Sequence, residues 1–381
     1  MRKKILIIAI LIPGSILYLL SDHHSNKMKS ISEFLKYEVD DKNTPSIQYA
    51  FFDADTITYQ FHYGLQNVKE NKAVNAATTY NIFSVTKTFT ALSVLQLAQS
   101  GKIELNKPAS DYIPDFPYSK HITVQQLLSH TSGIPNPLPL RWIHLASEHG
   151  TFNRDVFFKN VFRKSPKLKF EPGTEFKYSN LGYVLLGQLV EKVSGQKFEE
   201  YVDANIIKRA NAEPGSLGFY LNPSVHATGY HKKWSLSNAI LGFMIDKYKF
   251  MYETESGWKP FHNFYINGIA YGGMFGSANG LIKYAQALLK DSVLLNEKYR
   301  KILFSESEIN GKPTGMSLSW FTGTLNGNQY YAHAGGGGGY YVELRVYPEL
   351  KKGSVIMFNR SGMTDERILD RTDAFFLNAN R

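Results

Sequence analysis

The chain has 381 residues, of which 43% are apolar and 20% charged, with a formal net charge of +10 at pH 7 and no cysteine. This composition is that of a globular protein and excludes disulfides, thiolate metal sites and cysteine nucleophiles. The basic balance favours anionic partners. Because no dense basic tract with interleaved aromatics and no zinc-finger spacing occurs, we expect no nucleic-acid partner.

The N-terminus combines a basic start, residues 2–4, with an apolar segment, residues 5–20. As a helix this segment spans about 24 Å, slightly short of a hydrocarbon core of about 30 Å. The break at 13–14 suits a secretory signal, although no A-x-A cleavage site follows; the alternative is a buried first helix. We expect residues 1–25 to be a signal or a membrane anchor, with residues 5–20 tethering an extracytoplasmic (periplasmic or cell-surface) domain, residues 26–381.

The first elements of that domain are a helix and two strands. Apolar residues at helical spacing predict an amphipathic helix within 26–39, and strand-like runs cover 46–53 and 56–64. A strongly apolar helix is expected over 84–100, where Gly101 stops it. Residues 102–265 are predicted to be mostly helical.

The last part of the chain changes to strands. Four strand-like runs cover residues 316–323, 328–333, 340–348 and 353–359, and a closing helix is expected over 365–378. The predicted fold class is α/β, in the form of an α+β sandwich. One antiparallel sheet is built from both chain ends and flanked by helices, and the helical lobe, residues 102–265, is inserted at one edge.

The sequence contains one kind of serine nucleophile pattern, S-x-x-K, and lacks two other hydrolase motifs. No serine lies in G-x-S-x-G and H-E-x-x-H is absent, which disfavours an α/β-hydrolase and a metalloprotease site, so no metal is expected. S-x-x-K occurs three times, at Ser84/Lys87, Ser194/Lys197 and Ser256/Lys259. Ser84 opens the apolar helix with Lys87 on the same face, where an apolar environment would lower the proton affinity of the lysine. The alternative for this pair is an N-capping serine beside a solvated lysine.

A second candidate segment is EPGTEFKYSNLGYVLLG, residues 171–187. Tyr178 and Asn180 bracket one residue, so in an extended segment their side chains point the same way. Asn180 can cap the helix that follows. Tyr178 near a cationic lysine would ionise more easily and serve as a general base. The alternative is a packing aromatic before a capped helix.

The third segment is HAGGGGGY, residues 333–340. Five consecutive glycines do not match either phosphate-binding glycine pattern, and flanking strand runs disfavour a flexible linker. A strand edge that lies close to a bound substrate explains them better, because glycine has no Cβ to clash.

These segments, together with ITVQQLLSHTSGI (122–134) and YGGMFGSANGL (271–281), resemble the serine β-lactamase and penicillin-recognising family, most closely its class C-like branch. The resemblance begins at about residue 40 and extends to about 360. It implies an acyl-enzyme mechanism with no cofactor. It also implies roles for seven residues: the nucleophile Ser84, its activating partner Lys87, the general base Tyr178, the substrate-orienting Asn180, the strand residues His333 and Gly335, and Gly336, whose N–H would join that of Ser84 in an oxyanion hole.

One departure from the family pattern affects the expected substrate. His333 stands where lactamases carry the lysine of Lys-Thr-Gly, so a permanent cation for a substrate carboxylate is missing. The segment GKPTG (311–315) precedes the wrong strand, and His130 is expected to be structural. We therefore expect an exported serine hydrolase of esters or amides, with D-amino-acyl groups of the cell envelope among the candidates. The alternatives are a D,D-peptidase or weak β-lactamase, and a catalytically silent envelope-binding protein.

Overall fold

The computed structural model describes the chain in five ranges: residues 30–41, 43–137, 142–233, 245–361 and 368–377. The predicted signal or anchor, residues 1–25, lies outside them. Within these ranges no helix is both long and apolar enough to cross a membrane.

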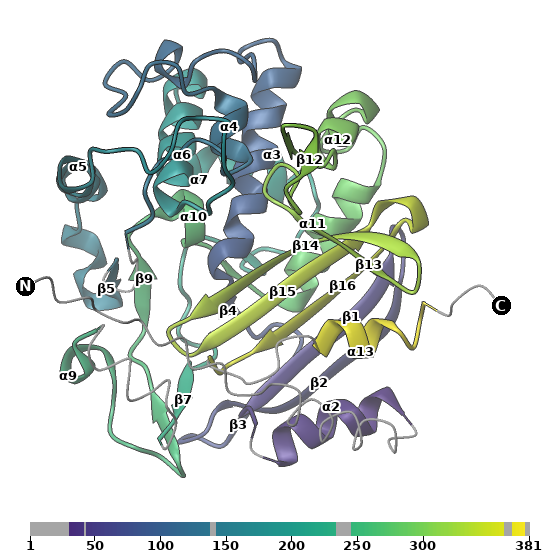
Figure 1. Cartoon of the computed structure of the whole chain (residues 1–381). Helices are drawn as coiled ribbons and strands as arrows, with labels where there is room; N and C mark the ends of the chain where they lie inside the picture. Colours follow the sequence, from purple (N-terminus) through teal and green to yellow (C-terminus); the bar gives the residue numbers. More distant parts are fainter. Residues whose placement is uncertain (1–29, 42, 138–141, 234–244, 362–367, 378–381) are drawn as a thin grey trace, which may run out of the picture.

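A seven-stranded antiparallel sheet joins the two ends of the chain (Figure 1), in the order β13-β14-β15-β16-β1-β2-β3. Its strands are β1 (Ser46–Asp53), β2 (Ile57–Asn67), β3 (Lys72–Ala73), β13 (Phe321–Leu325), β14 (Asn328–Gly337), β15 (Tyr340–Tyr347) and β16 (Lys352–Phe358). The two ends meet where β1 pairs with β16, from Ile47 opposite Phe358 to Asp53 opposite Lys352. The predicted sheet is confirmed, and β3 is an addition to it.

Helices cover both faces of this sheet. Helices α2 (Ile31–Asp40) and α13 (Ile368–Asp373) pack against Tyr49 and Phe51 of β1. Ala50 and Phe52 point to the opposite face and join the main core, where α11 (Ala278–Leu289) packs (Figure 1). Because successive side chains of a strand alternate between faces, a strand covered on both sides is buried almost throughout. The closing helix ends at Asp373, before the end predicted at 378, and the predicted start at 365 lies outside the described residues.

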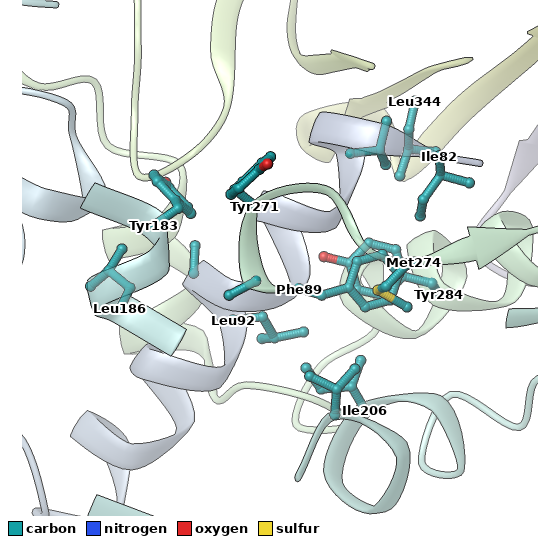
Figure 2. Packing of buried hydrophobic residues seen from close by; sticks show 14 of the residues in the cluster. Ile82, Phe89, Leu92, Tyr183, Leu186, Ile206, Tyr271, Met274, Tyr284 and Leu344 are labelled. Carbon is teal, nitrogen blue, oxygen red and sulfur yellow. The ribbon is translucent and has the colours of Figure 1, made fainter. Parts of the chain in front are cut away.

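Helix α3 (Thr86–Gln99) runs through the middle of the molecule and is buried from Thr86 to Ala98. A helix that is apolar on all sides is expected to lie inside a large protein. Figure 2 shows the packing around it, from Ile82 and Leu344 near the sheet to Ile206 in the helical part. Lys87 therefore lies within the core.

The middle of the chain begins as a helical region. Its elements are η2 (Ala109–Asp111), α4 (Val124–Leu128), β5 (Ile143–Leu145), η4 (Ala146–Thr151), α5 (Arg154–Lys164), α6 (Asn180–Ser194), α7 (Phe198–Val202) and the π turn η5 (Asp203–Ile207). Shorter elements follow: β6 (Leu217–Gly218), β7 (Tyr230–Lys232), α9 (Lys247–Phe250), β8 (Trp258–Pro260), β9 (Phe264–Ile266), α10 (Ile269–Gly272) and β10 (Phe275–Gly276). The prediction of a mostly helical stretch over 102–265 is thus wrong for the described residues after 207. Glycines and prolines between 214 and 229 favour turns there.

The remaining short elements are β4 (Tyr80–Asn81), η1 (Phe83–Val85), α12 (Glu297–Leu303), β11 (Glu308–Ile309), β12 (Lys312–Pro313) and η6 (Pro348–Leu350). The strand predicted over 316–323 begins later, as β13. Ser319 explains the difference, because its backbone has a φ of 77° and so cannot continue an extended strand.

The pairing of β14 exposes the edge that the glycine run suggested. Strand β13 pairs with β14 only as far as Ala332, whereas β15 continues beside it to Gly337. From His333 to Gly337, one edge of β14 therefore has no strand partner among the described residues. That free edge lies next to η1, the short helix that carries Ser84.

Candidate active site

Ser84 lies in η1, immediately before α3, and is half-buried. The preceding residue, Phe83, has a φ of 46°. A left-handed backbone is uncommon for a bulky residue and persists only where surrounding packing enforces it. The rings of Phe264 and Tyr340, each 6.3 Å from the Phe83 ring between centroids, supply that packing. The serine is thus presented on a strained and well-supported turn.

Lys87 contacts the hydroxyl of Ser84 directly. Its Nζ lies 3.0 Å from Ser84 Oγ and donates to the main-chain oxygen of Tyr271 at 2.8 Å. The side chain is 0% exposed, and its Nζ lies over the rings of Tyr178, Tyr271 and Tyr183 at 4.9, 5.2 and 5.6 Å from the ring centres. Burial holds the pKa of Lys87 well below its usual range. The amine can therefore take a proton from the serine.

Tyr178 precedes α6, and the Nζ of Lys87 lies 4.9 Å from the centre of its ring. Burial raises the pKa of Tyr178, more than its interaction with Ser84 lowers it. The expectation that this tyrosine ionises more easily is therefore wrong in direction. The reason is burial, which disfavours the charged phenolate form. A neutral Tyr178 can still pass a proton between Lys87 and a substrate.

His130 holds the backbone on both sides of Tyr178. Its Nδ1 accepts the N–H of Ser179 at 3.0 Å, and its main-chain oxygen accepts the N–H of Lys177 at 2.9 Å. The imidazole also lies against the Tyr178 ring, with 4.3 Å between centroids. Burial lowers the pKa of His130 well below its usual value, so the ring is neutral. His130 thus has the structural role that was expected, and the residue that it supports is Tyr178.

Asn180 is the first residue of α6, but Ser179 is the residue that caps this helix, by accepting the N–H of Gly182. The expected capping by Asn180 is therefore wrong. The backbone N–H and the Nδ2 of Asn180 both donate to Asn136 Oδ1, at 3.0 and 3.1 Å. Asn180 Oδ1 is buried and has no hydrogen-bond partner among the described residues. The amide is thus held in one orientation beside Ser84.

His333 lies on the free edge of β14 with 1% of its surface exposed. Its Nδ1 bonds to the main-chain oxygen of Ala334 at 2.8 Å, so this nitrogen carries the proton. Burial, and next the proximity of Lys87, lower the pKa of His333 to about 3. The imidazole is neutral at pH 7, as the sequence predicted.

The glycines of the run differ in the neighbours that an added Cβ would meet. A Cβ at Gly335 would lie 2.3 Å from Ile82 O and 2.8 Å from Ser84 N, so this glycine lets β14 approach the nucleophile turn. A Cβ at Gly336 would lie 3.5 Å from the Tyr341 ring, an ordinary contact. The closest approach to Ser84 is therefore made by Gly335.

The other sequence candidates lie elsewhere. Ser194 ends α6, Ser256 lies in an exposed turn before β8, and GKPTG forms part of the β11–β12 hairpin.

Sequence reasoning missed the Tyr271 carbonyl, because a main-chain acceptor has no side-chain signature. It also missed a cavity of about 100 Å³ beside Ser84. The cavity is lined by Phe83, Ser84, Ile143, Asn180, Ile245, Phe261, Phe264, Ile266, Tyr271, Gly272 and Gly336 to Gly338.

Known proteins resemble this chain in sequence and in fold. Protein flp of Staphylococcus aureus (strain MW2) is 24% identical over 368 residues, which are 94% of this chain and 68% of the relative. The octameric penicillin-binding protein homologue from Pyrococcus abyssi superposes with a TM-score of 0.71 at 23% identity, over 90% of this chain and 75% of that one. The D-amino acid amidase from Ochrobactrum anthropi SV3 has the same fold, with a TM-score of 0.72 at 17% identity, over 92% of this chain and 99% of that one. The family model described as Beta-lactamase matches residues 31–378, so the chain belongs to the Beta-lactamase family.

Proposed function

We propose that the protein is an exported serine hydrolase that cleaves esters or amides through an acyl-enzyme on Ser84. The observation that carries this proposal is the 3.0 Å contact between Lys87 Nζ and Ser84 Oγ, made by a lysine whose pKa is depressed by burial. A neutral amine at this distance is placed to activate the hydroxyl as a nucleophile.

The steps follow from the positions of the side chains. Lys87 takes the Ser84 proton while Oγ bonds to the substrate carbonyl carbon, and the N–H groups of Ser84 and Gly336 stabilise the resulting oxyanion. The lysine proton then passes, through the Tyr178 hydroxyl, to the leaving group as its bond breaks. In the second half of the reaction a water molecule takes the place of the Ser84 hydroxyl: it gives up a proton by the same path, attacks the acyl-enzyme carbonyl, and releases the acid and free Ser84. Asn180 orients the substrate, and no cofactor takes part.

The related proteins suggest which esters and amides to test. One neighbour is named a D-amino acid amidase and another a penicillin-binding protein homologue. D-Amino-acyl compounds of the cell envelope and penicillins are therefore both candidate substrates. The neutral His333 argues against strong binding of a penicillin carboxylate, because it offers no cation.

A fluorophosphonate probe tests the proposal. Intact mass should show one label on wild type, none on Ser84→Ala, and undiminished labelling of the matched controls Ser194→Ala and Ser256→Ala. A labelled Ser84→Ala protein would show that another serine is the nucleophile. Failure of wild type to react would favour the envelope-binding alternative. Fast acylation by a fluorescent penicillin would favour the D,D-peptidase or β-lactamase alternative.

A further inference from the structure

The cavity beside Ser84 has one wall made by the two-stranded ribbon β5–β9. Ile143 pairs with Ile266, and Leu145 pairs with Phe264. Because side chains alternate along a strand, Phe264 and Ile266 share one face of the ribbon with Ile143. The side chains of the intervening pair, His144 and Tyr265, lie on the other face and line a second cleft. The ribbon thus presents only its apolar face to the cavity.

Phe264 is fixed in place within that wall. It is 1% exposed, and its ring lies 6.1 Å from that of Phe261 and 6.3 Å from that of Phe83, between centroids. A Cβ at Gly338 would lie 2.4 Å from the Phe264 ring. Gly338, with a φ of 50°, therefore provides the room that this ring needs. The glycine run thus makes room for the wall of the cavity as well as for the turn that carries Ser84.

The position of the cavity identifies the part of the substrate that it receives. Both Ser84 and Gly336 line it, so a substituent on the carbonyl carbon bonded to Ser84 Oγ points into it. The leaving group must instead reach its proton donor, Tyr178. Tyr178 packs against His130, His333 and Phe321, outside the cavity lining. The cavity therefore holds the acyl group.

The size and polarity of the cavity limit that group. An apolar cavity of about 150 Å³ binds benzene, which has six carbon atoms, so the 100 Å³ cavity has room for roughly four. Most of the lining side chains are isoleucine and phenylalanine, which reward buried methylenes. The polar side chains of the lining are those of Ser84, Asn180 and Tyr271, and no carboxylate in the part of the chain that the structure describes lines the cavity to pair with a buried ammonium group.

We infer that this cavity is an acyl pocket that selects short, uncharged, apolar acyl groups of about four carbons. The inference rests on the proposed function and deepens it, because it names the acyl class. It also gives an order of preference among candidate substrates. The protein should prefer an isobutyryl ester to the D-alanyl ester, which has the same shape but carries an ammonium group in place of one methyl group.

A chain-length series of 4-nitrophenyl esters tests the size of the pocket. The kcat/KM of each ester is divided by the rate constant of its hydrolysis by hydroxide, which removes differences in carbonyl reactivity. From acetate to butyrate this ratio should rise about fourfold per methylene, the equivalent of about 0.8 kcal/mol for each buried CH₂. It should then level off. A flat or falling series from acetate to butyrate would overturn the inference.

The matched pair tests the charge. Isobutyryl and D-alanyl esters, treated in the same way, should differ at least tenfold in favour of the isobutyryl ester. A preference for the D-alanyl ester would refute the apolar pocket and leave the serine hydrolase intact. Failure of the proposed function is recognised separately, because Ser84 would then not react with the fluorophosphonate.

Two variants on one strand test the wall itself. Ile143→Ala removes a side chain that lines the cavity, whereas Leu145→Ala removes similar bulk two residues along, outside the lining. The ratio of hexanoate to butyrate turnover should rise at least threefold in Ile143→Ala and stay at the wild-type value in Leu145→Ala. Because each ratio comes from one preparation, the fraction of folded enzyme cancels. Equal ratios in both variants would show that Ile143 does not bound the pocket.

Discussion

His130 Nδ1 accepts the backbone N–H of Ser179 at 3.0 Å, and through this bond the histidine holds the residue that follows Tyr178. His130 itself has a φ of 58°, a conformation that asparagine tolerates better than most residues. The hydrogen bond, the backbone geometry and the contact between the His130 and Tyr178 rings together fix the position of the Tyr178 hydroxyl.

Substitution of His130 should therefore slow catalysis more than it destabilises the fold. His130→Ala loses the acceptor for Ser179, and misplacement of Tyr178 should lower kcat by about tenfold to a hundredfold. His130→Asn keeps an acceptor and suits the positive φ, so it should recover much of that loss. The measurements are single-turnover acylation and thermal unfolding. Equal kcat values for the two variants would show that the Ser179 hydrogen bond does not position the tyrosine.

The pH dependence of acylation should identify the group that takes the serine proton. The pKa of Lys87 is lowered by burial, and only the neutral amine accepts a proton. The kcat/KM should thus rise as the pH rises through this depressed pKa and then reach a plateau. Lys87→Ala should abolish the rise.

Tyr178→Phe is the informative comparison. Because burial raises the Tyr178 pKa, the rise with pH belongs to Lys87 and should persist in this variant. Its plateau should be lower by about 10²–10⁴-fold. The double variant should lose far less than the product of the two single losses, since both residues serve one proton path. Disappearance of the rise in Tyr178→Phe would instead make tyrosinate the base.

Prediction from the sequence found the residues that the structure brings together, and it missed features that depend on tertiary contacts. Ser84, Lys87 and Tyr178 lie in recognisable motifs, with Lys87 Nζ close to both the Ser84 hydroxyl and the Tyr178 ring. The direction of the Tyr178 pKa shift was missed because it depends on burial, which a motif does not contain. The apolar wall was missed for a related reason. Residues 264–266 carry no helical or strand period long enough to predict β9, and only pairing with Ile143 defines the face that they present.

The neutral His333 predicts a preference for substrates without a carboxylate in the leaving group. A 3-hydroxybenzoate ester and the same ester with its carboxyl group methylated form a matched pair. Wild type and His333→Gln should both prefer the methylated compound, because neither has a cation on the edge of β14. His333→Lys should reduce the preference by up to about tenfold, through a charge-assisted hydrogen bond. A tenfold preference of wild type for the free carboxylate would contradict this role and favour a D,D-peptidase.

The last prediction separates two adjacent glycines. The family resemblance gives the backbone N–H of Gly336 a place in the oxyanion hole, and a side chain there is therefore expected to disturb that site for every substrate. In the structure an added Cβ has ordinary contacts at Gly336, at 3.5 Å, but at Gly335 it would meet Ile82 O at 2.3 Å and Ser84 N at 2.8 Å. Both obstacles at Gly335 are backbone atoms of the nucleophile turn, which cannot rotate away as a side chain can.

Gly335→Ala should therefore displace β14 from Ser84 and lower kcat/KM by about a hundredfold or more for all esters, consistent with the cost of misplacing an oxyanion donor. Gly336→Ala should lower it by less than tenfold. The ratio of the two variants, measured on acetate and butyrate esters together with circular dichroism of each protein, checks this order. If Gly336→Ala proves the more damaging of two folded variants, the close approach to the nucleophile is made by Gly336, and the sequence-based expectation holds after all.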